Sequence, residues 1–164
     1  MKIARVTVTK GGEMMEYFKE LRKFVGHRPL ILPGAVVLII NEQNEVLLQH
    51  RIDGNWGLPG GLMELAESLE GTAAREVEEE TGLKVTTLEL VGVFSGPEYY
   101  MKVSNGDEFY SVTAVYATKD YSGDMEPNPD ETQDLRFYAF DQLPSGLSQS
   151  YRNFIEAYLV QQRQ

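Results

Sequence analysis

Residues 61–83 read GLMELAESLEGTAAREVEEETGL, and this stretch is the most informative part of the 164-residue chain. It combines a run of glutamates with one arginine, at position 75, and it has a glycine near each end. The pattern predicts a helix over residues 68–81. We expect Ser68 to cap the start of this helix and Gly82 to end it in the left-handed conformation.

The predicted helix gathers three carboxylates on one face. Each residue turns by about 100°, so that Glu79 lies near about −60° and Glu80 near about +40° relative to Glu76, whereas Glu78 lies on the opposite side. Carboxylates on one face repel each other, and a bound divalent cation removes that penalty. Oxygen ligands without Cys or His favour Mg²⁺ or Mn²⁺ over zinc. Arg75 is expected to hold the carboxylates by charge-assisted hydrogen bonds.

A solvated acidic face is the plain alternative for a helix rich in glutamate. The residues just before the stretch favour a site instead, because positions 56–61 read WGLPGG. A loop dense in glycine and proline lets backbone carbonyls approach a metal or a phosphate closely. We expect Trp56 to pack under this loop.

The stretch resembles the Nudix box, G-x5-E-x7-R-E-U-x-E-E-x-G-U, where U is an aliphatic residue. All of its fixed positions are matched, by Gly61, Glu67, Arg75, Glu76, Val77, Glu79, Glu80, Gly82 and Leu83. The chain is therefore similar to the Nudix hydrolases. This resemblance implies an α/β fold, an α/β/α sandwich with a mixed β-sheet over about Leu30 to Pro144. It also implies a magnesium-dependent enzyme that splits a diphosphate linkage attached to a nucleoside.

The resemblance also implies roles for residues. The metal ligands would be three carboxylates and a backbone carbonyl, namely Glu76, Glu79, Glu80 and Gly60. Glu67 would support Arg75 or an additional ion. The cations would polarise the phosphate oxygens and activate a water, with Mn²⁺ as a substitute for Mg²⁺.

The general base has two kinds of candidate. Glu76 takes this role in some proteins of the family, and an acid on a late loop does so in others. The late-loop candidates are Glu126, Asp130 and Glu131. For Glu131, a turn-capping role is the alternative to a catalytic one.

Substrate contacts are expected near two other segments. His50 and Arg51 end a predicted strand, and either could reach a phosphate. Tyr99 and Tyr100, with Phe109 and Tyr110, flank a predicted hairpin turn at Asn105-Gly106, where rings can stack on a nucleobase or belong to the core.

The substrate class stays open between two kinds of nucleotide. The leading hypothesis is a nucleoside diphosphate derivative such as ADP-ribose or a nucleotide sugar. The second is a nucleoside triphosphate, including an oxidised one. Pro97 lies 14 residues after Leu83 and the tyrosines lie two and three residues beyond it, so that these substrate markers of the family conflict. A non-catalytic nucleotide-binding regulator is the alternative of another class.

Charge and composition limit the partners. The net charge is −10, and residues 60–83 contribute −6 of it, so that binding of a nucleic-acid polymer is not expected. The longest apolar run, Ala35 to Ile40, is too short to span a bilayer. The chain has no cysteine and no visible signal peptide, so we expect a cytoplasmic location and no membrane association.

The length predicts one domain over residues 1–164. Residues 1–29 form an extension with a strand at 3–9 and a helix at 13–25, which either completes the domain or forms a homodimer contact. We interpret its basic run, Arg22 to Arg28, as a solvated face, and we expect the segment to serve assembly or stability. The other predicted elements are strands at 35–40, 46–50, 83–95, 99–103, 108–118 and 135–140, and a helix at 149–160.

Overall fold

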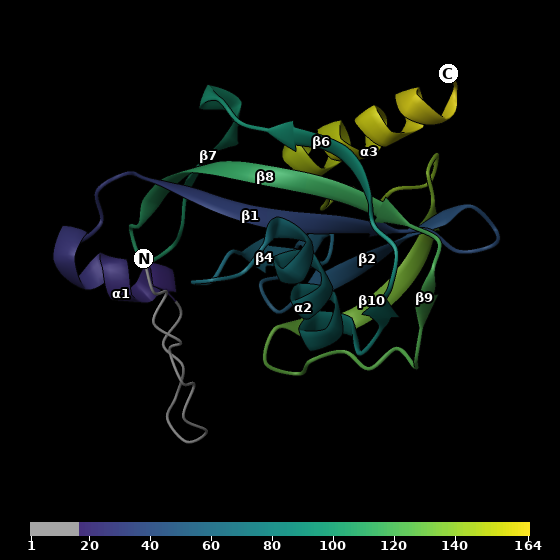
Figure 1. Cartoon of the computed structure of the whole chain (residues 1–164), viewed down its shortest axis with the longest axis horizontal. Helices are drawn as coiled ribbons and strands as arrows, with labels where there is room; N and C mark the ends of the chain where they lie inside the picture. Colours follow the sequence, from purple (N-terminus) through teal and green to yellow (C-terminus); the bar gives the residue numbers. More distant parts are fainter. Residues whose placement is uncertain (1–16) are drawn as a thin grey trace, which may run out of the picture.

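The computed structural model describes residues 17–164, and two long neighbouring strands form the middle of its main sheet (Figure 1). β1 (Leu30–Ile39) and β8 (Glu108–Thr118) pair in parallel along their lengths. The antiparallel strands β4 (Gly60–Leu62), β6 (Glu89–Phe94) and β7 (Tyr100–Lys102) complete the sheet. The order is β4-β1-β8-β6, and β7 pairs with β8. The mixed sheet that we expected is therefore confirmed.

Two smaller sheets adjoin it. β10 (Thr132–Ala139), β2 (Glu45–Arg51) and β3 (Trp56–Gly57) form an antiparallel sheet in the order β10-β2-β3. β5 (Lys84–Val85) pairs with β9 (Tyr121–Ser122). A short 3-10 helix, η1 (Pro97–Tyr99), leads into β7.

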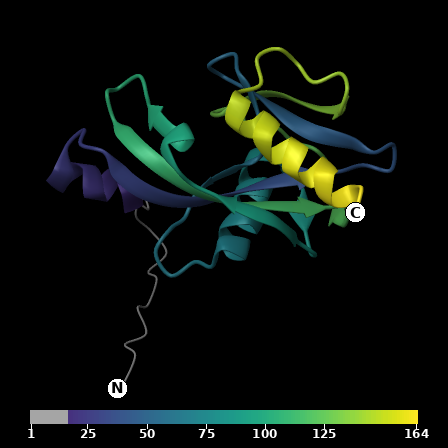
Figure 2. The ribbon, with the colours of Figure 1, turned by 90° about the horizontal axis from the view of Figure 1, so that it is seen from above.

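Helices cover both faces of the main sheet (Figures 1 and 2). The apolar run of β1 alternates between two core clusters: Val36 and Leu38 pack in one, and Val37 in the other. The first cluster holds apolar residues of α3 (Gln149–Gln162), and the second holds those of α2 (Leu69–Thr81). This arrangement confirms the α/β/α sandwich. Within residues 17–164, no helix combines the length and the apolar character that crossing a membrane requires.

The N-terminal extension is described only in part. Of the helix expected at 13–25, the structure shows α1 (Tyr17–Val25), and the strand expected at 3–9 lies outside the described residues. α1 lies at one end of the molecule, beside the beginning of β1 (Figure 1). None of its residues is buried, and the ring of Phe24 is 83% exposed. The helix is therefore held by polar contacts more than by an apolar face.

Three predicted boundaries were wrong. β1 begins at Leu30, five residues before the predicted start at 35, because Pro33 and Gly34 are accommodated within it. The extended segment predicted at 83–95 is broken between β5 and β6, where the hydroxyls of Thr86 and Thr87 donate to Asp120. β10 begins at Thr132, before the predicted start at 135.

The two ends of α2 form as predicted. The Ser68 hydroxyl accepts a hydrogen bond from the Gly71 amide, and Gly82 ends the helix with φ of 74°. A Cβ atom at Gly82 would lie 2.9 Å from the Asp124 carbonyl oxygen. Position 82 therefore needs a glycine both for its dihedral angle and for its space.

We predict that Gly82→Ala lowers the free energy of unfolding by about 1–3 kcal/mol, because alanine is strained at positive φ and crowds a backbone oxygen. Gly71→Ala is the matched control. It lies inside the same helix, where its Cβ meets only the Ser68 hydroxyl, at 3.3 Å. The control should be neutral or stabilising by up to about 1 kcal/mol. Urea unfolding of both variants measures the contrast, and equal destabilisation would contradict it.

Candidate active site

α2 presents its glutamates at graded depths. The Glu80 side chain is 3% exposed and that of Glu76 is 14% exposed, whereas Glu79 is 56% exposed. Glu78 points elsewhere, toward Lys84, with 3.5 Å between Oε1 and Nζ. The predicted contrast between Glu78 and the other three is therefore present in the structure.

Glycines allow β4 to lie directly against these carboxylates. A Cβ atom at Gly61 would lie 2.4 Å from Oε1 of Glu76, and one at Gly60 would lie 2.2 Å from the carbonyl oxygen of Ala35. The Gly60 amide donates to Oε2 of Glu80 at 2.9 Å. Position 60 therefore has no space for a side chain beside β1, whereas a side chain at position 61 would displace the Glu76 carboxylate.

Arg75 gathers the acidic groups around one guanidinium. Its Nε and Nη2 donate to the two carboxylate oxygens of Glu67, at 2.5 and 3.0 Å. Its Nη1 donates to Glu76 at 2.8 Å and to Glu79 at 3.1 Å, and Nη2 also donates to the Leu62 carbonyl. The hydrogen bonds from Arg75 lower the pKa of Glu67 to about 2. Glu67 is thus the principal partner of Arg75.

Burial disfavours the ionised form of two carboxylates, those of the buried Glu80 and the partly buried Glu76. Burial raises the pKa of Glu80 to about 7, although Arg51 and the Gly60 amide act in the other direction. Burial also raises the pKa of Glu76, against the effect of Arg75. Since burial penalises an ionised carboxylate, both groups have a physical reason to take a cation.

Within residues 17–164, no three acidic or histidine side chains converge on one point as they stand. Glu76 and Glu79 turn to Arg75, whereas Glu80 turns to Gly60. The donor set nevertheless suits a hard divalent cation, because it consists of carboxylate and carbonyl oxygens. To bind one ion together, these side chains have to rotate away from their present partners.

Arg51 and one late-loop acid, Glu131, both affect the pKa of Glu80. Nη2 of Arg51 lies 4.0 Å from Oε1 of Glu80. Burial disfavours the charge on Arg51, but Tyr151, Glu80 and nearby acids outweigh it and raise its pKa. The charge of Glu131 also raises the pKa of Arg51, Glu76 and Glu80, although less than the other charged groups that act on each of them.

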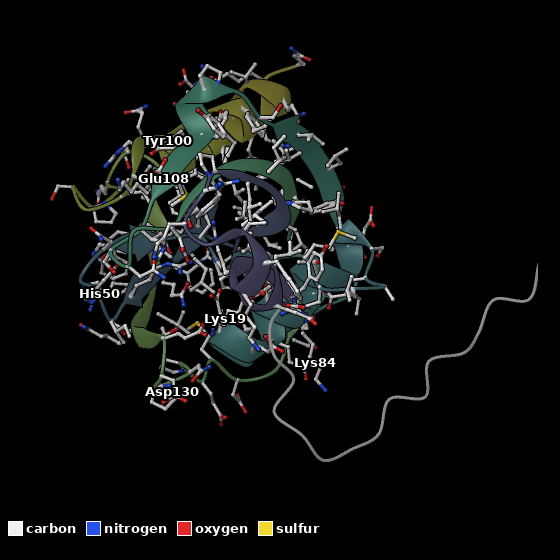
Figure 3. The ribbon with its side chains drawn as sticks, turned by 90° about the vertical axis from the view of Figure 1, so that its left-hand side faces the viewer. Lys19, His50, Lys84, Tyr100, Glu108 and Asp130 are labelled. Atoms are coloured by element: carbon white, nitrogen blue, oxygen red, sulfur yellow. The ribbon has the colours of Figure 1, made fainter. Side chains whose placement is uncertain are left out.

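The other two late-loop acids have different surroundings. The Glu126 amide donates to the Thr81 carbonyl at 2.8 Å, so that this residue is held at the end of α2. The Asp130 amide donates to the side chain of Asn128, and Asp130 lies at the outer edge of the molecule (Figure 3). Of the three late-loop acids, Glu131 is the one whose charge affects the pKa of the box carboxylates Glu76 and Glu80.

A cavity of about 510 Å³ opens beside the box. Arg51, Gly60, Gly61 and Leu62 form part of its lining. Its other walls come from β1, from the β7–β8 hairpin and from the start of α3, and include Gly34, Ala35, Val36, Tyr99, Tyr100, Met101, Lys102, Phe109, Ser111, Thr113, Ser148, Ser150, Tyr151 and Phe154. A second cavity, of about 460 Å³, is lined by Thr87, Lys119 and other residues outside the box.

The residues that we predicted to contact the substrate differ in their exposure to this cavity. Arg51 and Tyr100 line it, and the Tyr100 side chain is 41% exposed. Tyr99 borders it too but is only 6% exposed, because its ring stacks on Phe154 in the core. His50 stacks on Trp56, 4.6 Å between ring centroids, and Trp56 also meets Tyr138 edge-on. Trp56 packs against the core cluster that includes Leu58 of the glycine- and proline-rich loop.

Sequence reasoning missed the contribution of α3. Ser148, Ser150 and Tyr151 lie about 100 residues after Arg51 in the chain, and no local pattern marks them as site residues. Tyr151 packs close to Arg51, since a Cβ atom at Gly57 would touch both side chains. Contacts of this kind depend on the folded chain.

Known proteins resemble the chain in sequence and in fold. It shares 30% identity with the NAD-capped RNA hydrolase NudC of Vibrio vulnificus, over 72% of this chain and 42% of that protein. It shares 29% identity with an ADP-ribose pyrophosphatase of Methanocaldococcus jannaschii, over 86% of this chain and 80% of that one. The crystal structure of a MutT NUDIX hydrolase from Burkholderia pseudomallei superposes with a TM-score of 0.67 at 29% identity, over 78% of this chain and 98% of that one.

The chain spans less than half the length of the NudC relative, whereas it spans most of the other two proteins. The family model named NUDIX domain matches residues 31–158, which include the box, the cavity and the helices on both faces of the sheet. The resemblance read from residues 61–83 is thereby confirmed, and the chain belongs to the NUDIX domain family.

Proposed function

We propose that the chain is a Mg²⁺-dependent pyrophosphohydrolase that cleaves the diphosphate linkage of a nucleoside diphosphate derivative, such as ADP-ribose or a nucleotide sugar. One observation carries this proposal: the partly buried carboxylate of Glu76 and the buried carboxylate of Glu80 lie against Gly61 and Gly60, and these two glycines line a cavity of about 510 Å³ together with Arg51. The ADP-ribose pyrophosphatase that matches most of both chains supports this substrate class.

The proposed cation site consists of Glu76, Glu79 and Glu80 with the Gly60 carbonyl. Mg²⁺ bound there would neutralise phosphate charge and supply Lewis-acid chemistry, and Mn²⁺ could replace it. We assign Glu67 to holding Arg75, because both of its oxygens accept hydrogen bonds from that guanidinium.

The chain's own residues supply the other parts of the reaction. We assign Glu131 as the base that takes a proton from the attacking water, since its charge acts on the box carboxylates while Glu76 is bonded to Arg75. Arg51 offsets the negative charge of a phosphate in the cavity, and the exposed face of Tyr100 offers a surface to a nucleobase. The homodimer contact and the cytoplasmic location stay predictions.

The first prediction from the proposed function concerns the substrate and the metal. A panel containing ADP-ribose, a nucleotide sugar and nucleoside triphosphates should show fastest turnover of the diphosphate-linked compounds, with a nucleoside monophosphate among the products. Exhaustive chelation should abolish turnover, and added Mg²⁺ should restore it. Chromatography of the products measures both effects. Turnover of triphosphates alone, or full activity without divalent metal, would contradict the proposal.

The second prediction uses the raised pKa of Glu80. Without divalent metal, its ionised form destabilises the folded protein, so the melting temperature should fall as the pH rises from about 5 to 8, past the folded-state pKa of about 7. Glu80→Gln should weaken this fall and should reduce the stabilisation by Mg²⁺ at pH 8.

Glu78→Gln is the matched control for that change, because the Glu78 side chain is 57% exposed and faces Lys84. It should leave the melting temperature and the hydrolysis rate close to those of the wild type. If Glu78→Gln is as harmful to hydrolysis as Glu80→Gln in a folded protein, the assigned ligands are wrong.

The third prediction separates the late-loop acids. Glu131→Gln should lower kcat by roughly 10²–10⁴-fold, as expected for loss of a general base, with little change in KM. Asp130→Asn and Glu126→Gln should stay within a few fold of the wild type. Steady-state kinetics with ADP-ribose and Mg²⁺ measure the three variants. A loss confined to Asp130→Asn or Glu126→Gln would move the assignment to that residue.

A further inference from the structure

Arg22 of α1 is not the solvated residue that we predicted from the basic run. Its side chain is only 11% exposed, and Nη1 donates to the carbonyls of Gly26 at 3.0 Å and Arg28 at 2.7 Å. Its Nη2 donates to the Glu108 carbonyl at 2.8 Å, and Nε lies 3.5 Å from the Asp107 carboxylate. One guanidinium therefore joins α1, the turn into β1 and the β7–β8 hairpin.

The tip of this hairpin is organised around Asp107. This residue is 8% exposed, and its carboxylate lies 2.7 Å from Nδ1 of His27 and accepts from the Asn105 side chain at 3.0 Å. Its carbonyl accepts from the Val103 amide across the turn. Arg22 thus contacts the hairpin where side-chain and backbone hydrogen bonds are concentrated.

The same hairpin forms one wall of the substrate cavity. Tyr100, Met101 and Lys102 of β7 line it, as does Phe109 of β8. Lys102 pairs in register with Glu108, the residue whose carbonyl Arg22 holds. Tyr100 and Glu108 lie next to each other in Figure 3.

β7 has weak support of its own. It has three residues, all of them exposed, and it pairs only with β8 among the described strands. An edge strand of this length is marginal without further contacts. Outside the hairpin, Tyr99 just before β7 packs on Phe154 of α3, and the Arg22 guanidinium donates one hydrogen bond to Glu108 at the start of the strand beside β7.

We propose that Arg22 is a positioning residue for nucleotide binding, which fixes the β7–β8 hairpin as a preformed wall of the cavity. Without this contact the wall has to be ordered when the nucleotide binds, and the ordering cost weakens affinity. The chemistry proposed for the box uses residues of α2 and β4, outside the hairpin, and stays intact. This inference rests on the proposed function, because it assigns the nucleoside to the hairpin wall.

The test compares Arg22→Gln with Lys23→Gln, a neutral change at the exposed neighbouring residue of the same helix. Binding is measured by calorimetry with AMP and Mg²⁺, because AMP has no anhydride bond to lose. Arg22→Gln should raise the Kd for AMP and the KM for ADP-ribose by about tenfold, with kcat within about twofold of the wild type. Hydrogen exchange should accelerate in residues 100–109 and stay unchanged in α2. Lys23→Gln should match the wild type in every measurement.

Arg22→Lys provides a second, milder variant. Lysine keeps the positive charge beside Asp107 but cannot present the guanidinium fork to three carbonyls, so we expect an intermediate Kd. An unchanged Kd with faster hairpin exchange would overturn the proposal. So would a loss of kcat accompanied by faster exchange throughout α2, since that pattern reports a merely structural role.

The outcomes for the wild type separate the two proposals. If it binds AMP but hydrolyses no nucleotide of the panel, the proposed function fails and the Arg22 comparison still stands on Kd. If it shows no AMP binding in the presence of Mg²⁺, the nucleoside does not occupy the hairpin wall and this proposal is overturned.

Discussion

The site depends on the positive charge of the Arg75 guanidinium, which lies among several carboxylates. Arg75 donates to Glu67, Glu76 and Glu79, and its fifth contact is the Leu62 carbonyl on the neighbouring strand. Without this guanidinium, acidic groups a turn apart on α2 would repel each other and would favour an unravelled helix. The arginine fork matches carboxylate geometry, so it orients the acidic groups as well as offsetting their charge.

The second constraint is the close approach of β4 to α2 and to β1. The two glycines at the start of this strand bring backbone to the Glu76 carboxylate on one side and to β1 on the other. Glu80 is buried at the same place, and Arg51 and the Gly60 amide together do not offset the cost of burial, which is why its pKa is raised. The fold therefore holds a carboxylate in an unfavourable state, which is typical of functional sites and is relieved by a cation.

Much of this arrangement could be predicted from sequence because it is local. Residues three and four apart on a helix share a face whatever the rest of the chain does, so the contrast of Glu78 with Glu76 and Glu80 followed from spacing. The Ser68 and Gly82 caps also follow from local dihedral preferences. The surroundings of Tyr99 and Arg22 could not be predicted in this way. An aromatic residue beside a turn can face either the core or a cavity, and a basic residue on a short helix looks solvated until a distant hairpin is brought next to it.

The residues proposed for the chemistry and those that line the cavity differ in the same way, since the former are close in sequence and the latter are not. The groups proposed for the chemistry lie mainly within one contiguous segment and are positioned by helix geometry and two glycines. The cavity that would receive the rest of the nucleotide is assembled from β1, the β7–β8 hairpin and α3, whose lining residues lie from about 17 to 71 positions away from the box. Changes in the hairpin or in α3 can reshape that cavity without disturbing α2. Relatives with the names of an NAD-capped RNA hydrolase and an ADP-ribose pyrophosphatase can thus share one family domain, and the substrate of this chain depends on contacts that only the folded structure brings together.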